Sequence, residues 1–328
     1  MKKEKTGLGP VFFLCRNKMK KMQWKGPVFL ALAAFFWGTT FVAQDLSSDF
    51  VKPFTFNSLR MILGALFLLP VILVKNKGRF FATCPKKEDK KHLLLSSALC
   101  SLVLLVAANL QQFGISLGTG AGKSGFITAM YVVLVPVLGI FLKKKIRPVL
   151  WLCVLFSVFG LYLLCMASFS EGISGVLKNL SMSKGDLLTL GCALFYTFHI
   201  MVIDSTASET DGVMLSFFQF LFAGIMGLIL ALVFEQPQLT HIALGAGGIL
   251  YSAFFSCAVA YTLQILGQQC TPAVIASILM CMESVFAVLS DMVVLKTVLT
   301  TEEIIGCIFM FIAILGSSLS DFLPQKKK

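Results

Sequence analysis

The sequence predicts an all-α integral membrane protein with ten transmembrane helices, arranged as two inverted five-helix repeats with both termini in the cytoplasm. Three observations lead to this prediction. Of the 328 residues, 57% are hydrophobic and only 13% are charged, with a mean hydropathy of +0.87, which is not the balance of a soluble domain. Roughly ten stretches are long and apolar enough to cross a bilayer. The two halves of the chain also match each other in order.

A transmembrane helix needs about 20 mostly apolar residues. The expected spans, each set by such a stretch, are residues 27–44, 54–74, 93–113, 122–142, 149–168, 185–203, 213–234, 242–266, 273–294 and 302–320. The connectors between them are too short to bury a core of their own, so no soluble domain is expected. Any activity is therefore expected inside the bilayer.

These spans divide the chain into five parts. They are a basic cytoplasmic N-terminal segment (1–26), a first repeat (27–168), an extracellular connector (169–184), a second repeat (185–320) and a basic cytoplasmic tail (321–328). The basic start followed by an apolar run resembles a secretory signal, but it shows no convincing cleavage site and is interpreted as a retained first helix.

The net charge of +12 is a topology signal. Most lysines and arginines fall in connectors that the ten-span arrangement places in the cytoplasm, as the positive-inside rule requires. In a soluble chain this charge would raise the question of nucleic acid, but here no nucleic-acid partner is expected. The second half of the chain adds little to this topology signal, because its inner connectors "DSTASETDG" and "GQQCTP" hold no lysine or arginine. We expect a multi-pass protein of the plasma membrane in contact with the lipid bilayer.

The chain matches itself when it is shifted. A shift of 153 positions aligns matching residues without a gap across two loops, among them Leu110, Gln111 and Gly114 with Leu263, Gln264 and Gly267. Earlier in each half the shift is 159, which places Asp45 on Asp204. Because each copy has five spans, the second copy enters the membrane inverted. Inverted repeats are typical of alternating-access transporters with a small-molecule substrate at the repeat interface.

Glu283 lies in the middle of the apolar run "SILMCMESVFAVLSD". An ionised acid at the bilayer centre costs roughly 2.5 to 3.5 kcal/mol, so it should face the bundle interior or a wet cavity. Two interpretations stay open: a group that binds substrate or a proton, and a structural acid held by hydrogen bonds or by Arg60. Without a cation beside it the protonated form is favoured, which would suit a proton-coupling role.

Arg60 is the second charged candidate. It lies about a third of the way into the second span from the outer side. It could hold an anionic group of a substrate, pair with Glu283, or extend outward to the interface. The repeat places Gln219 at the matching position, so the charge itself is not duplicated.

The fourth span carries Ser124, Thr128 and Tyr131 at helical spacing. A tyrosine offers an apolar ring and a hydroxyl, which suits a cavity for small amphipathic solutes. Thr128 and Tyr131 are therefore predicted to bind substrate, with helix packing as the plainer alternative.

Five further intramembrane residues are candidates for the substrate site, and each also has a structural interpretation. Trp37 lies deep in the first span, away from the membrane boundary where tryptophans gather. Tyr196 and His199 occupy the matching part of the sixth span, and a histidine there can titrate or simply be a satisfied hydrogen-bonding group. Gln111 and Gln264 form a duplicated polar pair that could contact a ligand or another helix.

Signals for catalysis and metal binding are absent from the sequence. The ten cysteines are scattered without a CxxC pair, and the three histidines lie in separate segments. No GxSxG motif and no phosphate-binding loop occurs, so neither an enzyme nor an ATP-driven pump is indicated. We expect no cofactor and no metal.

The segments "FFWGTTFVA", "GKSGFITAMYVVLVPVLG" and "LMCMESVFAVLSDMVVLKTVLTTEEIIG" resemble EamA-type members of the drug/metabolite transporter superfamily. The resemblance implies ten helices in two inverted repeats around a central cavity, with the fifth and tenth helices more peripheral. It also implies transport of small metabolites, amino acids among them, or of drugs, mostly outward. Carried onto this chain, the "WG" pair is Trp37 and Gly38, and the acid of the ninth span is Glu283.

The chain departs from the family pattern in two places. Many relatives have a proline after the acid of the ninth span, where this chain has Ser284. Relatives often carry "GE" between the ninth and tenth spans, where this chain reads "VVLKTVLTTEE". Both departures concern the surroundings of Glu283 rather than the fold.

The predicted function is a secondary transporter that exports small organic metabolites, such as amino acids, by alternating access. One alternative is a multidrug or cationic-compound exporter in which Glu283 is the counter-charge. Another is a membrane scaffold that moves nothing, which should have a tightly apolar interior. The sequence leaves the substrate, the coupling ion and the oligomeric state open.

Overall fold

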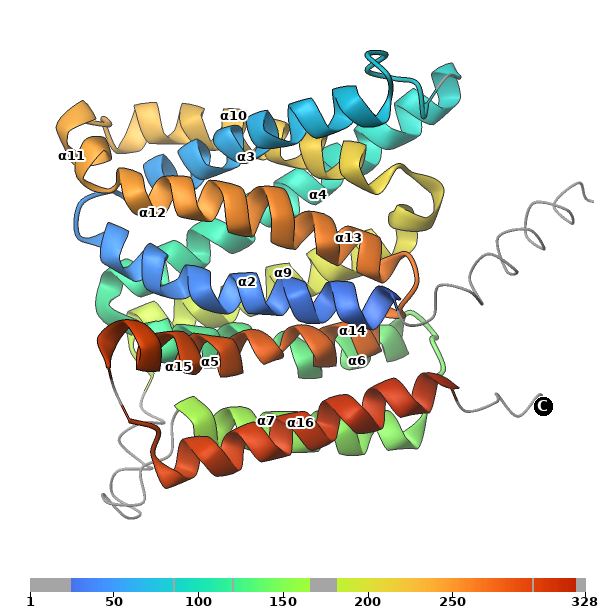
Figure 1. The fold of residues 1–328 in the computed structure, drawn as a ribbon, viewed down its shortest axis with the longest axis vertical. Helices are drawn as coiled ribbons and strands as arrows, with labels where there is room; N and C mark the ends of the chain where they lie inside the picture. The colour runs from blue at the N-terminus through green and yellow to red at the C-terminus, as the bar shows by residue number, and fades with distance from the viewer. Residues whose placement is uncertain (1–24, 85, 120, 166–181, 297, 323–328) are drawn as a thin grey trace, which may run out of the picture.

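A computed structural model describes residues 25–84, 86–119, 121–165, 182–296 and 298–322, and all regular structure within these ranges is helical (Figure 1). Nearly all of the expected N-terminal segment, most of the 169–184 connector and most of the C-terminal tail lie outside the described residues.

The chain forms α-helices with a few irregular helical turns between them. In chain order the α-helices are α2 (Lys25–Ser48), α3 (Pro53–Lys75), α4 (Lys87–Gly114), α5 (Ala121–Thr128), α6 (Tyr131–Phe141), α7 (Pro148–Cys165), α9 (Lys184–Thr206), α10 (Gly212–Phe234), α11 (Leu239–Leu244), α12 (Ala246–Tyr251), α13 (Thr262–Gln268), α14 (Ala273–Met280), α15 (Met282–Leu295) and α16 (Thr301–Phe322). Two π-helical segments, η1 (Ile115–Thr119) and η4 (Ser252–Tyr261), and one 3₁₀ turn, η3 (Ala207–Glu209), join them.

Within the described residues, nine helical segments are long and apolar enough to cross a membrane, and Pro148–Leu164 is a shorter apolar helix. The predicted all-α membrane class is confirmed. The described chain begins and ends at the same end of the bundle, where α2 starts and α16 finishes (Figure 1). The side of the membrane on which these ends lie stays a prediction.

Helix boundaries recur at the spacings found in the sequence. Pairs of helices that the shifts of 159 and 153 relate begin at matching residues: Lys25 and Lys184, Pro53 and Gly212, Pro148 and Thr301. The same regularity extends to the helix ends, as the backbone conformation there shows.

Four non-glycine residues of the described chain have positive φ, and they form two related pairs. Lys77 (φ 49°) and Gln236 (φ 52°) are 159 positions apart, and Lys143 (φ 57°) and Lys296 (φ 55°) are 153 apart. A left-handed residue is a common way to end a helix. The two halves of the chain therefore end corresponding helices in the same way.

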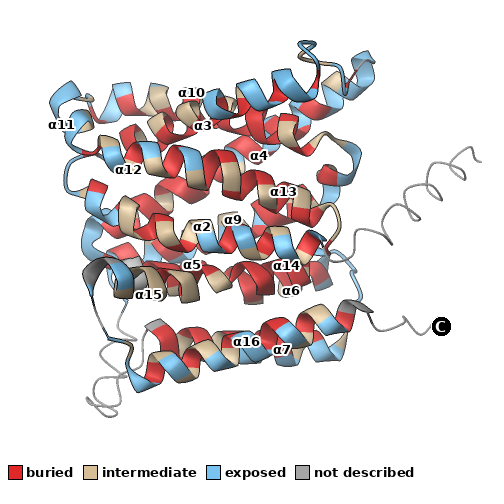
Figure 2. Cartoon of the chain, viewed as in Figure 1, coloured by how far each residue is buried: buried red, intermediate tan, exposed pale blue. Residues whose placement is uncertain are grey.

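The helices lie side by side in layers (Figure 1). α3 and α10 pack together at one end of the long axis, and α7 and α16 pack together at the other. α2 and α9 lie between them, so the fifth and tenth helices are peripheral, as the family resemblance implies. Buried residues gather on the faces between layers, while many outward residues are exposed apolar side chains (Figure 2).

The fourth and ninth spans are each broken near the middle. α5 ends at Thr128 and α6 begins at Tyr131, whereas α14 ends at Met280 and α15 begins at Met282. The two breaks fall at nearly the same place in the repeat. Each break interrupts the regular hydrogen-bonding ladder inside the bundle, which is tolerated in a membrane only where protein or a cavity surrounds it.

Glycines permit two close helix contacts. A Cβ on Gly38 of α2 would lie 2.6 Å from the carbonyl oxygen of Glu283, and a Cβ on Gly160 of α7 would lie 2.9 Å from that of Gly306 in α16. Backbones that approach this closely gain van der Waals contact, which drives helix association in membranes.

We expect Gly160→Ala to destabilise the α7–α16 pair by about 1–3 kcal/mol, because the added methyl group must push two backbones apart. The control is Gly247→Ala in α12, where a Cβ meets nothing within 4 Å. Thermal unfolding of the purified protein in detergent measures both. Equal midpoints for the two variants would contradict the close contact.

An ion pair joins the end of α3 to the start of α10. Lys75 Nζ lies 2.7 Å from Asp211 Oδ2, and Asp211 Oδ1 accepts hydrogen bonds from the backbone N–H groups of Val213 and Met214. Burial by itself raises the pKa of Asp211. The hydrogen bond and charge of Lys75, together with the Met214 N–H, outweigh this effect, and the pKa lies below its ordinary value.

A carboxyl group with a lowered pKa in the folded state stabilises the fold above its unfolded pKa, and this stabilisation is lost as the pH falls through the folded value. We therefore expect the unfolding midpoint of the wild type to fall as the pH drops below about 3.9, the ordinary pKa of aspartate. Asp211→Asn should be less stable at neutral pH and flatter across this range. The exposed Asp89→Asn is the control, and a wild-type-like profile for Asp211→Asn would reject this role.

Candidate functional site

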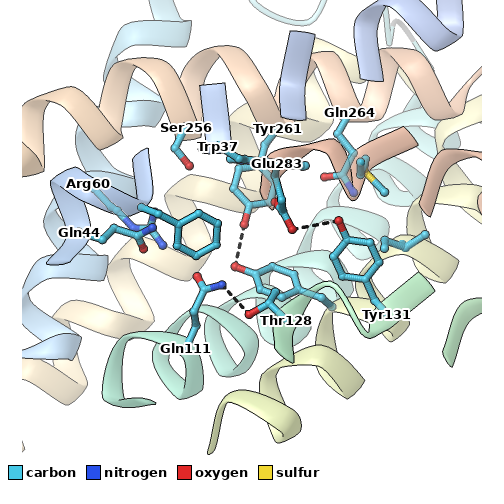
Figure 3. Close-up of a pocket in the computed structure, with 14 residues that line it drawn as sticks. Trp37, Gln44, Arg60, Gln111, Thr128, Tyr131, Ser256, Tyr261, Gln264 and Glu283 are labelled. Atoms are coloured by element: carbon cyan, nitrogen blue, oxygen red, sulfur yellow. Dashed lines mark hydrogen bonds between the residues drawn. The ribbon is translucent and has the colours of Figure 1, made fainter. Parts of the chain in front are cut away.

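A small cavity lies inside the bundle where α2, α3, α4, α9, η4, α13 and the two broken spans meet (Figure 3). Fourteen residues from these elements line it: Trp37, Phe41, Gln44, Arg60, Gln111, Thr128, Tyr131, Tyr196, Ile200, Ser256, Tyr261, Gln264, Met280 and Glu283. The space open to the centres of water molecules is about 40 Å³. The cavity is therefore small, and its wall combines aromatic rings with polar and charged side chains.

The two helix breaks bring Tyr131 and Glu283 together. Tyr131 is the first residue of α6, Glu283 is in the first turn of α15, and the tyrosine hydroxyl donates a hydrogen bond to Glu283 Oε1 at 3.0 Å (Figure 3). Glu283 is 5% exposed, and no lysine, arginine or histidine of the described chain lies within ion-pair distance of it. The N-terminus of α15 is an electrostatically favourable place for an acid.

Two further hydrogen bonds join pairs of residues in the cavity lining. Gln111 Nε2 donates to Thr128 Oγ1 at 3.0 Å, and Tyr261 donates to the hydroxyl of Tyr196 at 2.9 Å. The ring of Trp37 packs edge-on against Tyr261 with centroids 4.8 Å apart. These contacts fix the orientation of aromatic and polar groups from helices that are distant in the sequence.

Arg60 is held in place on one side only. It is 2% exposed, and its Nε donates to Asn57 Oδ1 at 2.8 Å. Asn57 is itself fixed, because its Nδ2 donates to the Ala108 carbonyl oxygen at 3.1 Å and to Asn109 Oδ1 at 3.0 Å. The structure shows neither an ion pair between Arg60 and Glu283 nor an extension of Arg60 to the surface.

The structure brings together eight of the nine candidates named from the sequence. The eight that line the cavity are Trp37, Arg60, Gln111, Thr128, Tyr131, Tyr196, Gln264 and Glu283. His199 does not line it. Its ring lies 5.9 Å from that of Tyr261, and its Nε2 shares a 3.1 Å hydrogen bond with Gln219 Oε1.

Six lining residues were missed by sequence reasoning: Phe41, Gln44, Ile200, Ser256, Tyr261 and Met280. The sequence could have indicated Gln44, Ser256 and Tyr261, because polar groups within apolar spans tend to face the bundle interior. The sequence could not have indicated Phe41, Ile200 and Met280, because apolar residues of these kinds are common throughout the spans.

The residues of the lining are suited to binding a small solute. It offers one guanidinium, one carboxyl group and several hydroxyl and amide groups beside aromatic rings, a combination that recognises small amphipathic solutes. Among the described residues, no group of three or more histidine, cysteine or acidic side chains is arranged to hold a metal ion.

A family model and several curated proteins that match this chain are named as transporters. The model of the EamA-like transporter family matches residues 24–166 and again residues 183–319. Over 300 residues the chain is 30% identical to an "Uncharacterized transporter" of Archaeoglobus fulgidus, covering 88% of this chain and 84% of the relative. It is 22% identical over 308 residues to an "Uncharacterized transporter" of Clostridium kluyveri, covering 92% and 94%. A crystal structure with 14% identity superposes with a TM-score of 0.70 over 90% of this chain and 96% of the other, which supports the fold.

The family match, the named relatives and the apolar helices thus define a polytopic membrane transporter. The chain belongs to the EamA-like transporter family, within the drug/metabolite transporter superfamily, and is a multi-pass protein of the plasma membrane.

We expect Tyr131→Phe to lower stability by about 1–3 kcal/mol, because it leaves the buried Glu283 carboxyl without its hydrogen-bond donor. Tyr162→Phe in α7 is the control, since the Tyr162 hydroxyl makes no hydrogen bond to a described residue. The unfolding midpoint in detergent measures the difference. A Tyr131→Phe protein as stable as the control would show that this hydrogen bond is dispensable.

Proposed function

We propose that this protein is a secondary transporter that moves small organic metabolites, amino acids or compounds of similar size, by alternating access, and that it acts as an exporter. The observation that supports the proposal is the small cavity that residues from both halves of the chain line, with the buried Glu283 in its wall. A membrane scaffold needs no such cavity, whereas a transporter needs a site that each side of the membrane reaches in turn.

The cavity supports a closed form of such a transporter. Each water molecule needs about 10–15 Å³ of accessible space, so the about 40 Å³ of this cavity holds a few waters and is too small for a metabolite. Substrate binding therefore requires the surrounding helices to move apart. The two broken spans are natural places for that movement, because their helical hydrogen bonding is already interrupted.

Ion pairs at both ends of α9 hold the closed arrangement. Asp186, in its first turn, lies 2.7 Å from Lys123 Nζ at the start of the fourth span. Asp204, in its last turn, pairs with Lys144 just beyond α6 and also accepts a hydrogen bond from Ala273 N at the start of α14. In alternating access one such contact would open while the other stays closed.

Glu283 is the proposed proton-coupling group. A carboxylate without a cationic partner is costly in a low-dielectric interior, which favours a carboxyl group that binds a proton when closed and exchanges it when the cavity opens. Its hydrogen bond from Tyr131 fixes one oxygen and leaves the other for a substrate or a proton.

The test is uptake and efflux by purified protein in liposomes, with a pool of labelled amino acids and small cations, at several pH gradients. We expect wild-type flux to follow the pH gradient. Glu283→Gln should lose this dependence, because a glutamine amide does not bind and release a proton in this pH range. The control is Glu88→Gln, an exposed residue of the first turn of α4. Flux that responds to the gradient equally in Glu283→Gln and the wild type would remove Glu283 from coupling.

A second candidate function is export of cationic compounds, with Glu283 as the counter-charge. It is favoured by the lack of a cation within ion-pair distance of Glu283 in the described chain. It is disfavoured by the guanidinium of Arg60 in the same cavity, which repels a cationic solute. In the same liposomes, a Glu283→Gln protein that lost only cationic substrates would support it.

A further inference from the structure

The guanidinium of Arg60 has hydrogen-bonding capacity that the protein does not use. A guanidinium has five N–H donors. Only the Nε donor is engaged, by Asn57, and neither terminal nitrogen donates a hydrogen bond to a described residue. Figure 3 shows the side chain at one end of the cavity, beside Gln44.

No described group neutralises this charge. No aspartate or glutamate of the described chain lies within 4.0 Å of Arg60. Besides the Asn57 acceptor, the guanidinium carbon lies 5.5 Å from the centre of the Phe56 ring. A buried cation without an anion is strongly disfavoured. An anion that entered the cavity would therefore gain from the charge and from donors that are already desolvated.

The fold itself does not require the cation. Gln219 stands at the position related to Arg60 by the shift of 159, on α10 instead of α3, and it is completely buried there. Its Oε1 pairs with His199, so the second half packs around a neutral amide at the corresponding place. The positive charge is present in one half only, so the duplicated fold does not depend on it.

Building on the proposed function, we propose that Arg60 binds a carboxylate group of the transported molecule, whose apolar part lies against Trp37, Tyr196 and Tyr261. The planar fork of a guanidinium matches a carboxylate with two parallel hydrogen bonds. Asn57 fixes the fork from behind and leaves its terminal nitrogens free. Among the described residues of the lining, Arg60 is the only lysine, arginine or histidine, and Glu283 is also present, so one negative charge is favoured over the two of a phosphate monoester.

The test compares phenylacetate with phenylacetamide, which have similar shapes but differ in charge, as ligands of the full chain in lipid nanodiscs. Wild-type protein should bind the carboxylate at least about tenfold more tightly than the amide, since charge-assisted hydrogen bonds account for such differences. Arg60→Gln should lose this preference while still binding the amide. Arg60→Lys should keep a weaker preference, because it retains the charge without the fork.

Arg79→Gln, at an exposed residue of the α3–α4 connector, is the matched control and should bind both ligands as the wild type does. A wild-type protein without preference for the carboxylate overturns the proposal, even if Arg60→Gln fails to fold. An Arg60→Gln protein that keeps the preference overturns it as well.

Flux measured with the same two compounds separates this proposal from the proposed function. Carboxylate-selective binding without any flux would contradict transport and leave the Arg60 site standing. Flux without carboxylate preference would leave transport standing and remove the site.

Discussion

The structure depends on one constraint, that a helix surrounded by hydrocarbon must keep its polar groups away from lipid. Along each span, apolar side chains such as Leu66, Leu152 and Leu155 are exposed, whereas polar side chains such as Thr128 and Gln264 are buried. The polar residues of many helices are therefore forced towards a common interior. There they either hydrogen-bond to one another, as His199 Nε2 and Gln219 Oε1 do, or line a cavity.

Duplication decides where that cavity lies. The family model matches each half of the chain, and the broken spans of the two halves meet near the centre with α2 and α9 beside them. The breaks place Tyr131 and Glu283, from different units, within hydrogen-bonding distance. The halves share a backbone plan, as the paired left-handed residues show, but they differ in the side chains at corresponding places. Arg60 and Gln219 are one such difference, and differences of this kind are what make a symmetric scaffold specific.

Much of this arrangement could be predicted from the sequence. The membrane class follows from composition, and the repeat register predicted from residues such as Gln111 and Gln264 reappears in the helix boundaries. The candidate site rested on the rule that intramembrane polar groups face inward, and that rule does not say whether such a group reaches a cavity. His199 is completely buried but hydrogen-bonds to Gln219 through Nε2 and does not line the cavity.

The missed residues have equally physical reasons. Ser256 and Tyr261 lie in the π-helical segment η4, where the helix no longer has the 3.6-residue period, so a projection of this span from the sequence misplaces their faces. Phe41 and Met280 join the lining because of the contact of α2 with its neighbours, which depends on tertiary packing. No local pattern encodes that contact.

In the proposed transport cycle the closed form must be reversible, and both ends of α9 are held by side-chain ion pairs. The ion pairs of Lys123 with Asp186 and of Lys144 with Asp204 are partly exposed on the lysine side. Exposed pairs contribute about 0–1 kcal/mol, and the Lys144–Asp204 pair is the more exposed of the two, whereas Asp186 is buried and its pair is harder to break. The interior contacts differ, because Gly38 brings α2 so close to α15 that a single methyl group would force the backbones apart. A bundle with close backbone packing at its centre and side-chain ion pairs at its ends can open at either end without losing its core, which is what the proposed alternating access requires.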